Sequence, residues 1–237
     1  MIDILFPVHN RVEFTKVSAD ALAKHTNKSL VRLVYIYDDK SVDGAGKQAY
    51  KILKATFQNV IVVSSFRGFG GPVEIMNDYI RQSTAEMFAK IDNDTVVCPN
   101  WLGVCCQVME DNQHLDLLGI EPHSPILAAD TPLVPRSYFE ARFIGGIGLM
   151  RTRIFRQAMK PLVQSAKYFG FTSWQTEHES VRKAWLSPAL PILLLDRIPE
   201  NPWLSLSAGY ISNGWQRPYG VYSLADKANW QDLKLIV

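Results

Sequence analysis

Strand-like segments alternate with helix-like segments over the first hundred residues, and this alternation restricts the fold more than any other feature of the sequence. The expected strands cover residues 2–6, 30–37, 59–64 and 87–91, and the expected helices cover residues 13–25, 45–57 and 72–83. Strands joined by helical crossovers pair in parallel, so the pattern predicts an α/β fold with a mostly parallel central sheet flanked by helices. The chain of 237 residues is expected to form a single domain with two halves, residues 1–102 and 103–237.

Polar loops follow each of the four expected strands, at residues 7–11, 38–43, 67–71 and 92–94. Ligands of such sheets bind where loops leave the carboxyl ends of the strands, so we expect the four loops to share one site. Glycine residues in the third loop permit a close approach of its backbone to a ligand. Asp43, at the end of the second loop, is expected to be the N-cap of the helix that follows.

Two acidic residues flank Asn93 in the segment that follows the fourth expected strand. On an extended strand, Asp92 and Asp94 point the same way and can bind one cation together. Taken alone, however, a short acidic segment of this kind is more often a turn, because Asp and Asn side chains bond their own backbone. The position of the segment beside three other polar loops favours the cation site.

The second half of the sequence is less regular. A short strand is expected at residues 115–120, followed by a proline-containing surface excursion at 121–142 and a glycine-containing strand at 143–150. Helices are expected at residues 153–163 and 176–185, before an aromatic, loop-rich tail from residue 197 onward. No internal repeat is visible.

The bulk composition excludes several classes of protein. A net charge of +2 gives no general attraction to polyanions, although a local basic patch remains open. The three cysteines, Cys98, Cys105 and Cys106, lack metal-type spacing and are expected to pack in the core of a reduced, cytoplasmic protein. The sequence contains no recognisable export signal, and its longest apolar window, residues 186–195, is too short to span a bilayer. Peripheral membrane contact is the alternative to a purely cytoplasmic location.

Four motifs occur in an order that is typical of one enzyme family: Phe6–Arg11, Tyr37–Gly44, Arg67-Gly68 with Asn77, and Ile91–Asp94. Together they resemble the opening strand and loop, the Asp-Asp turn, the third loop and the Asp-x-Asp motif of the metal-dependent nucleotide-sugar glycosyltransferases of the GT-A fold, in particular family two. In the second half, Gly145-Gly146 is similar to the acceptor-side Gly-Gly strand of that family. The resemblance covers residues 2 to about 102 best.

The resemblance implies roles for individual residues. The nucleotide-sugar donor would contact residues of all four loops and of the third helix: Pro7, His9, Asn10, Arg11, Asp38, Asp39, Arg67, Asn77, Asp92 and Asn93. Asp94 would bind Mn²⁺ or Mg²⁺, while Asp92 would bind the same metal, the ribose or a water molecule. His178 is a further candidate metal ligand, with a structural role as the alternative. Gly145, Gly146 and Trp174 would lie on the acceptor side.

The general base is expected in an acidic helix of the second half. Where the family has a Glu-Asp pair, this sequence has Glu177-His178-Glu179. Residues two apart do not share a helical face, so only one carboxylate is expected to reach the acceptor. We select Glu177, and we expect Glu179 to pair with Arg182 or Lys183 at helical spacing. A carboxylate base implies a direct displacement that inverts the anomeric centre.

The donor implied by the resemblance is a nucleoside diphosphate sugar, with UDP-sugars favoured and a hexosyl group transferred. The acceptor would be a saccharide or a lipid-linked saccharide. A modified nucleic acid is a lesser alternative, because aromatic and arginine side chains also accommodate bases. Two other functions stay open: a sugar nucleotidyltransferase, whose glycine-rich opening loop is not found at residues 7–11, and a nucleotide-sugar-binding protein without catalysis.

Overall fold

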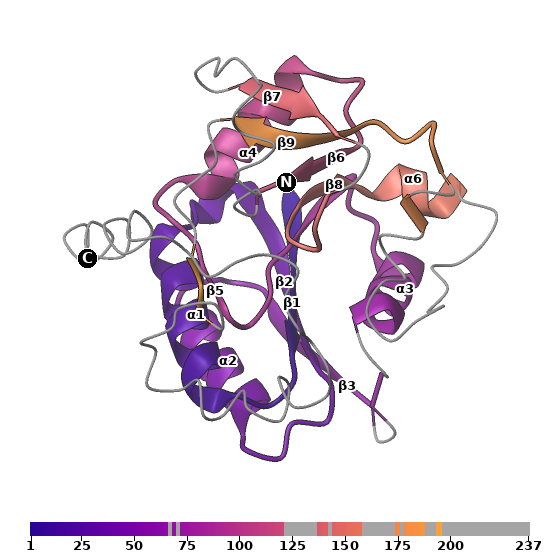
Figure 1. The fold of residues 1–237 in the computed structure, drawn as a ribbon. Coiled ribbons are helices and arrows are strands. Elements are labelled where there is room, and N and C mark those ends of the chain that lie inside the picture. The colour runs from indigo at the N-terminus through magenta and orange to yellow at the C-terminus, as the bar shows by residue number, and fades with distance from the viewer. Residues whose placement is uncertain are drawn as a thin grey trace.

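A computed structural model describes residues 1–65, 68–69, 72–120, 137–141, 144–157, 174–175, 178–187 and 193–195. Within these ranges an eight-stranded sheet has the strand order β3-β2-β1-β4-β8-β6-β9-β7, and helices lie on both of its faces (Figure 1). The predicted α/β class is therefore confirmed. Of the helices in these ranges, none has the length and apolar character that a bilayer span requires.

The first half of the chain builds the parallel part of the sheet. Its strands are β1 (Ile2–Val8), β2 (Val31–Asp38), β3 (Val60–Ser64) and β4 (Met87–Lys90), and all of their pairings with one another are parallel. They are connected through α1 (Val12–His25), the short 3-10 helix η1 (Lys28–Leu30), α2 (Ala45–Lys54) and α3 (Pro72–Gln82). This is the predicted order of strands and helices, with boundaries that differ by a few residues.

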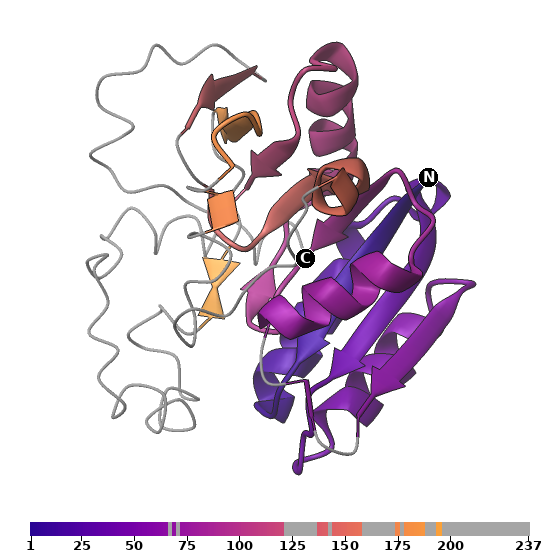
Figure 2. The same cartoon turned by 90° about the vertical axis from the view of Figure 1, so that its right-hand side faces the viewer.

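Two hydrophobic clusters cover the two faces of the sheet. On β1, Ile4 and Phe6 belong to the cluster formed with α1, α2 and α4 (Trp101–Asp111). Leu5 points the other way, into the cluster formed with α3 and α6 (Thr152–Gln157), both of which lie in front of the sheet in Figure 2. Because β1 is covered on both faces, all seven of its residues are buried.

The second half extends the sheet with β6 (Leu117–Gly119), β7 (Ser137–Glu140), β8 (Gly148–Arg151) and β9 (Lys183–Ser187). Strand β8 is antiparallel to both β4 and β6, β9 is parallel to β6, and β7 is antiparallel to β9. A separate two-stranded sheet joins β5 (Thr95–Val96) to β10 (Leu193–Leu194). The second half is thus attached to the first through the pairing of β8 with β4 and of β10 with β5.

The prediction of a helix at residues 176–185 is wrong for its described part, residues 178–185. Residues 178–182 form turns, and residues 183–187 form β9. Resemblance to an acidic helix of the family suggested the helix, but pairing with β6 on one side and β7 on the other satisfies the backbone of residues 183–187 as a strand. Tertiary pairing overrides local propensity here.

Three smaller predictions also need correction. Pro7 does not end β1 but lies inside it, opposite Tyr37; since β4 pairs only with residues 3–5 of β1, the strand has one partner at this point and tolerates a proline. The glycine-containing strand begins only at Gly148. Residues 137–140, which we had assigned to an irregular surface excursion, form β7 at the edge of the sheet.

Several predictions lie outside the described residues. These are the roles of Arg67 and Glu177, most of the excursion at 121–142, the second half of the helix at 153–163, and the aromatic tail.

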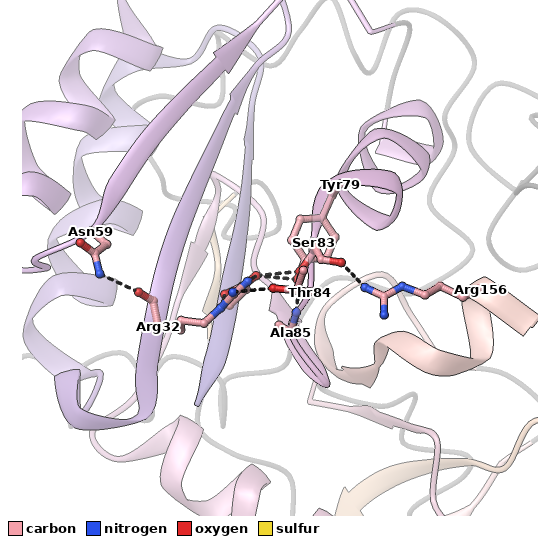
Figure 3. A network of polar contacts seen from close by, with 8 residues as sticks. Arg32, Asn59, Tyr79, Ser83, Thr84, Ala85 and Arg156 are labelled. Atoms are coloured by element: carbon pink, nitrogen blue, oxygen red, sulfur yellow. Dashed lines mark hydrogen bonds and ion pairs between the residues drawn. The ribbon is translucent and has the colours of Figure 1, made fainter.

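A buried polar network lies at the amino-terminal edge of the parallel strands. Asp3 is fully buried and accepts hydrogen bonds from Arg32 (2.7 and 2.8 Å), from the Tyr79 hydroxyl (3.0 Å) and from the Ser83 hydroxyl (2.9 Å). Figure 3 shows Arg32 on β2 reaching toward Tyr79 and Ser83 at the end of α3, with Arg156 on the far side of Ser83. This network anchors α3 to the sheet at the end opposite the polar loops.

Candidate functional site

The loop after β1 has an unusual backbone conformation. Asn10 and Arg11 are consecutive left-handed residues, with φ values of 53° and 61°. Left-handed backbone costs conformational energy for residues other than glycine, and it persists only where the surroundings enforce it. Here the backbone N–H of Asn10 donates to Ser41 Oγ (2.9 Å), and Asn10 Oδ1 accepts from the N–H of Val42 (2.9 Å). The loops after β1 and β2 are therefore joined, as predicted.

The acidic residues of the second loop connect it to its neighbours. Asp39 Oδ1 accepts from the N–H of Phe69 in the third loop (2.5 Å), and the Asp39 carbonyl accepts from His9 Nδ1 (2.6 Å). Asp38 Oδ1 accepts from the N–H of Ser41 (2.9 Å) and closes a turn of its own loop. Three of the four predicted loops are therefore in direct contact.

Asp43 was predicted to cap α2, and its carboxylate does more than this. Its Oδ1 accepts from the N–H of Ala45 (3.0 Å) in the first turn of α2, while its Oδ2 accepts from the N–H of Val12 (2.9 Å) in the first turn of α1. The N-cap position itself belongs to Gly44, with φ 82°. One carboxylate thus satisfies a terminal N–H group of two different helices.

The Asp92–Asn93–Asp94 segment is a turn and not an extended strand end. The N–H of Thr95 donates to the Asp92 carbonyl (3.0 Å), and Asn93 Nδ2 donates to the Asn10 carbonyl (3.1 Å) and to Thr15 Oγ1 (2.9 Å). Strand alternation therefore does not govern the two carboxylates. Asn93 instead attaches the fourth loop to the first.

Each of the two carboxylates forms an ion pair with a different basic side chain. Arg11 Nη1 lies 2.8 Å from Asp94 Oδ2, and the side chains of the pair are 11% and 17% exposed. The ammonium of Lys90 pairs with Asp92 Oδ1. Lys90 was not among the predicted site residues, although it lies two positions before Asp92 at the end of β4 and is buried. A lysine in an otherwise apolar buried strand was the signal that could have identified it.

The oxygen donors of this segment fit a hard divalent cation. Carboxylates are the ligands that Mg²⁺ and Mn²⁺ prefer, and such ions often complete their coordination with phosphate oxygens and water. Within the described ranges, no group of three or more His, Cys, Asp and Glu side chains could hold a metal ion by itself. The chemistry of the donor set therefore suits a site in which a bound diphosphate supplies further ligands.

One of the residues predicted on the acceptor side, Gly146, lies next to this segment through Lys90. A Cβ atom added to Gly146 would meet Lys90 Nζ at 3.3 Å, so this glycine leaves room for the lysine. Two residues earlier, the N–H and carbonyl of Ile144 both bond the buried side-chain amide of Gln175 (2.8 and 3.0 Å). Gln175 thus holds the Ile144 end of this segment, and Lys90 lies close to its Gly146 end.

Trp174 and His178 lie together. The Trp174 ring stacks on Phe155 (centroids 4.8 Å apart) and on His178 (4.6 Å), and His178 Nδ1 donates to the Trp174 carbonyl (2.8 Å). The ring of His178, a predicted metal ligand, thus contacts Trp174 through stacking and a hydrogen bond, and neither contact involves Asp92 or Asp94. Asn77 is buried on α3.

Glu179 lines a pocket of about 300 Å³ together with Glu140, Ala141, Gln175, Val181, Arg182 and Lys183. Strands β9 and β4 run in the same direction. The residues just before β9, which include Glu179, therefore lie at the edge of the sheet where β4 begins. Asp92 follows the end of β4 and lies at the opposite edge. Burial lowers the pKa of Lys183, whose ammonium donates to the carbonyls of Gln175 and His178. Arg182 pairs with Glu140 (3.7 Å), on the adjacent strand β7. Of the two expected partners of Glu179, Arg182 thus pairs with Glu140 instead, whereas Lys183 has a favourable Coulombic interaction with Glu179.

Comparison with solved structures supports the fold. A crystal structure of S. aureus TarS 1–349 superposes with a TM-score of 0.63 at 18% identity, covering 83% of this chain and 61% of that one. TarS 1–349 in complex with UDP-GlcNAc gives 0.62 at 18% identity, with 80% and 56% covered. The mannosyltransferase PcManGT from Pyrobaculum calidifontis, in complex with GDP-Man and Mn²⁺, gives 0.61 at 12% identity, with 92% and 66% covered. The present chain thus spans about three fifths of the length of the TarS 1–349 chain.

The parallel half-sheet, the antiparallel extension through β8 and the cluster of loops define an α/β protein of the GT-A class. A search of curated protein sequences gives no match. The sequence profile described as glycosyl transferase family 2 matches residues 3–145, and the chain belongs to that family.

Proposed function

We propose that this protein transfers a hexosyl group from a nucleoside diphosphate sugar to an acceptor hydroxyl. The observation that carries the proposal is the contact of Asn93 with Asn10, which joins the Asp92–Asp94 segment to the loops after β1 and β2. Membership of glycosyl transferase family 2 supports the same reaction. In this cluster the loops after β1 and β2 would bind the nucleoside, and Asp92 and Asp94 would lie next to the diphosphate.

The proposal includes a divalent metal held by Asp94. When bound, Mg²⁺ or Mn²⁺ would neutralise the negative charge that accumulates on the departing diphosphate. Asp92, held by Lys90, would orient the ribose or a water molecule. The similar protein PcManGT has been solved with GDP-Man and Mn²⁺, and TarS with UDP and with UDP-GlcNAc, which makes UDP- and GDP-sugars the first donors to test.

The acceptor hydroxyl requires a general base, and the candidates are Glu177 and Glu179. A carboxylate that removes the proton during a direct displacement would give inversion at the anomeric carbon. Glu179 lines the pocket at the start of β9, together with the buried side chain of Lys183. That pocket lies at the sheet edge where β4 begins, whereas Asp92 follows the end of β4, so we propose Glu177 as the first candidate. Replacing each by Gln and measuring the transfer rate distinguishes them.

The decisive experiment measures the release of nucleoside diphosphate from a panel of UDP- and GDP-sugars, with and without Mn²⁺. Mn²⁺-stimulated release that is lost in Asp94→Asn supports the proposal. If no donor gives metal-stimulated release but nucleotide-sugars still bind, the protein is a binding protein without catalysis. If it instead forms pyrophosphate from a nucleoside triphosphate and a sugar 1-phosphate, it is a nucleotidyltransferase. A saccharide or lipid-linked saccharide is the proposed acceptor, with modified nucleic acid as the second class to test.

A further inference from the structure

The carboxylate proposed as the metal ligand already has a cationic partner. Arg11 Nη1 donates to Asp94 Oδ2 at 2.8 Å, and both side chains are mostly shielded from solvent. Ion pairs of this length that are shielded from water are much stronger than exposed ones. A divalent cation that binds Asp94 must therefore compete with the guanidinium of Arg11.

The backbone of Arg11 is held in the conformation that makes this pair. Arg11 and Asn10 are both left-handed, and the carbonyl of Asn10 accepts a hydrogen bond from Asn93, next to Asp94 itself. The guanidinium also lies over the ring of Phe14, at 5.4 Å from its centroid. An energetically costly backbone that aims one side chain at one carboxylate is typical of functional sites.

We propose that Arg11 is a diphosphate-binding residue that occupies Asp94 until a divalent cation displaces it. This inference rests on the proposed function, and it gives Arg11 a role different from the nucleoside contact that family resemblance implies. A guanidinium matches phosphate oxygens in a bidentate geometry and is always charged. Once released from Asp94, it is close to the site in which the metal and the diphosphate would meet.

The exchange couples the two ligands. The metal frees Arg11 for the diphosphate, and the diphosphate draws Arg11 away from Asp94 and so frees the carboxylate for the metal. Because such coupling is reciprocal, Mn²⁺ raises the affinity for a nucleoside diphosphate by the same factor as the nucleoside diphosphate raises the affinity for Mn²⁺. Removing the guanidinium removes this part of the coupling.

The test compares wild type with Arg11→Asn and Arg11→Gly, two residues that suit the left-handed backbone and the start of a helix. Mn²⁺ binding is measured without nucleotide, from the electron paramagnetic resonance signal of free Mn²⁺. We expect both variants to bind Mn²⁺ about tenfold more tightly, because a charge-assisted bond no longer competes for Asp94. In saturating Mn²⁺, we expect both to bind UDP or GDP about tenfold more weakly, as measured by calorimetry.

The matched control is Lys16→Gln. Lys16 lies on α1, the helix that Arg11 caps, carries the same charge as Arg11 and pairs with Glu13 on the surface. Its replacement changes the net charge by the same amount without contacting Asp94, so both affinities should stay at the wild-type values.

Asp94→Asn separates failure of the inference from failure of the proposed function. If Asp94→Asn and wild type bind Mn²⁺ equally, Asp94 is not a metal ligand, and the proposed metal site and the inference both fail. If Asp94→Asn weakens Mn²⁺ binding but the two Arg11 variants bind Mn²⁺ no more tightly than wild type, the inference alone is overturned. Tighter Mn²⁺ binding together with weaker nucleotide binding in both Arg11 variants supports it.

Discussion

The ammonium group of Lys90 forms an ion pair with the carboxylate of Asp92, although the Lys90 side chain is only 3% exposed and that of Asp92 is 35% exposed. The lysine therefore carries most of the desolvation cost of this pair. It also lies close to Gly146, so one buried cation lies between the acidic segment and a glycine predicted on the acceptor side. Positioning Asp92 is the role that this arrangement suggests.

The first prediction concerns Lys90→Met. Methionine fills a similar volume without a charge, so the free energy of unfolding should stay the same or rise by about 1 kcal/mol. Donor turnover should nevertheless fall by about a hundredfold, because Asp92 loses the partner that fixes its position. Thermal unfolding and steady-state kinetics on the same preparation measure the two effects, with Lys54→Met on the exposed face of α2 as the control. Parallel losses of stability and turnover would instead assign Lys90 a purely structural role.

The second prediction compares two glycines at and just before the start of β8, Gly146 and Gly148. A Cβ atom at Gly148 would collide with the backbone carbonyl of Leu118 on β6, which cannot move without disturbing the sheet. At Gly146, the nearest atom is the flexible tip of Lys90. Gly148→Ala should therefore lower the free energy of unfolding by about 2 kcal/mol or more, and Gly146→Ala by less than about 1 kcal/mol. Urea denaturation measures both, and equal losses would contradict this assignment of the close contacts.

The third prediction concerns the carboxylate shared by two helices. Asp43→Ala removes the acceptor of both Val12 and Ala45, so it should cost about 2 kcal/mol, or about 1 kcal/mol for each cap. Asp43→Asn keeps one oxygen acceptor and should cost about half as much. Chemical denaturation of the two variants provides the measurement. The same loss in both would mean that only one of the two hydrogen bonds contributes to stability.

The fourth prediction is a dependence of stability on pH. Burial, with a smaller contribution from Glu110, raises the pKa of the Cys106 thiol from 9.0 to about 11. The folded state then binds a proton that the unfolded state has lost. The contribution of the Cys106 thiol to the free energy of unfolding is therefore fully present below pH 9 and is lost as the pH rises from 9 through 11.

Cys106→Ala isolates this effect. Relative to this variant, wild type should lose at most about 3 kcal/mol of unfolding free energy between pH 8 and pH 11. Denaturation of both proteins at each pH gives the difference directly. A difference that stays constant with pH would mean that Cys106 ionises equally in both states.

All three cysteines are free and buried, as the sequence predicted.

The sequence by itself was sufficient for the parallel half of the fold. Short apolar runs such as that of β1 are typical of buried strands, and helices between such strands favour parallel pairing, so the first four strands and their polar loops follow from local pattern. The prediction that these loops meet is confirmed by contacts such as that of Asn10 with Val42. The antiparallel second half has no comparable rule, and its helix at residues 176–185 was predicted wrongly.

Only the tertiary structure decided how the acidic segment is arranged. Arg11 and Asp94 are 83 positions apart, and neither their pairing nor the turn at Asn93 follows from local sequence. The partner of Asp92 is Lys90, whose ammonium lies close to Gly146 in the segment before β8. Residue types and the order of the elements can be read from the sequence. The basic side chain that pairs with each carboxylate depends instead on packing between segments that are distant in the sequence. For that reason the sequence predicted where the site lies, and the fold determined which residues neutralise it.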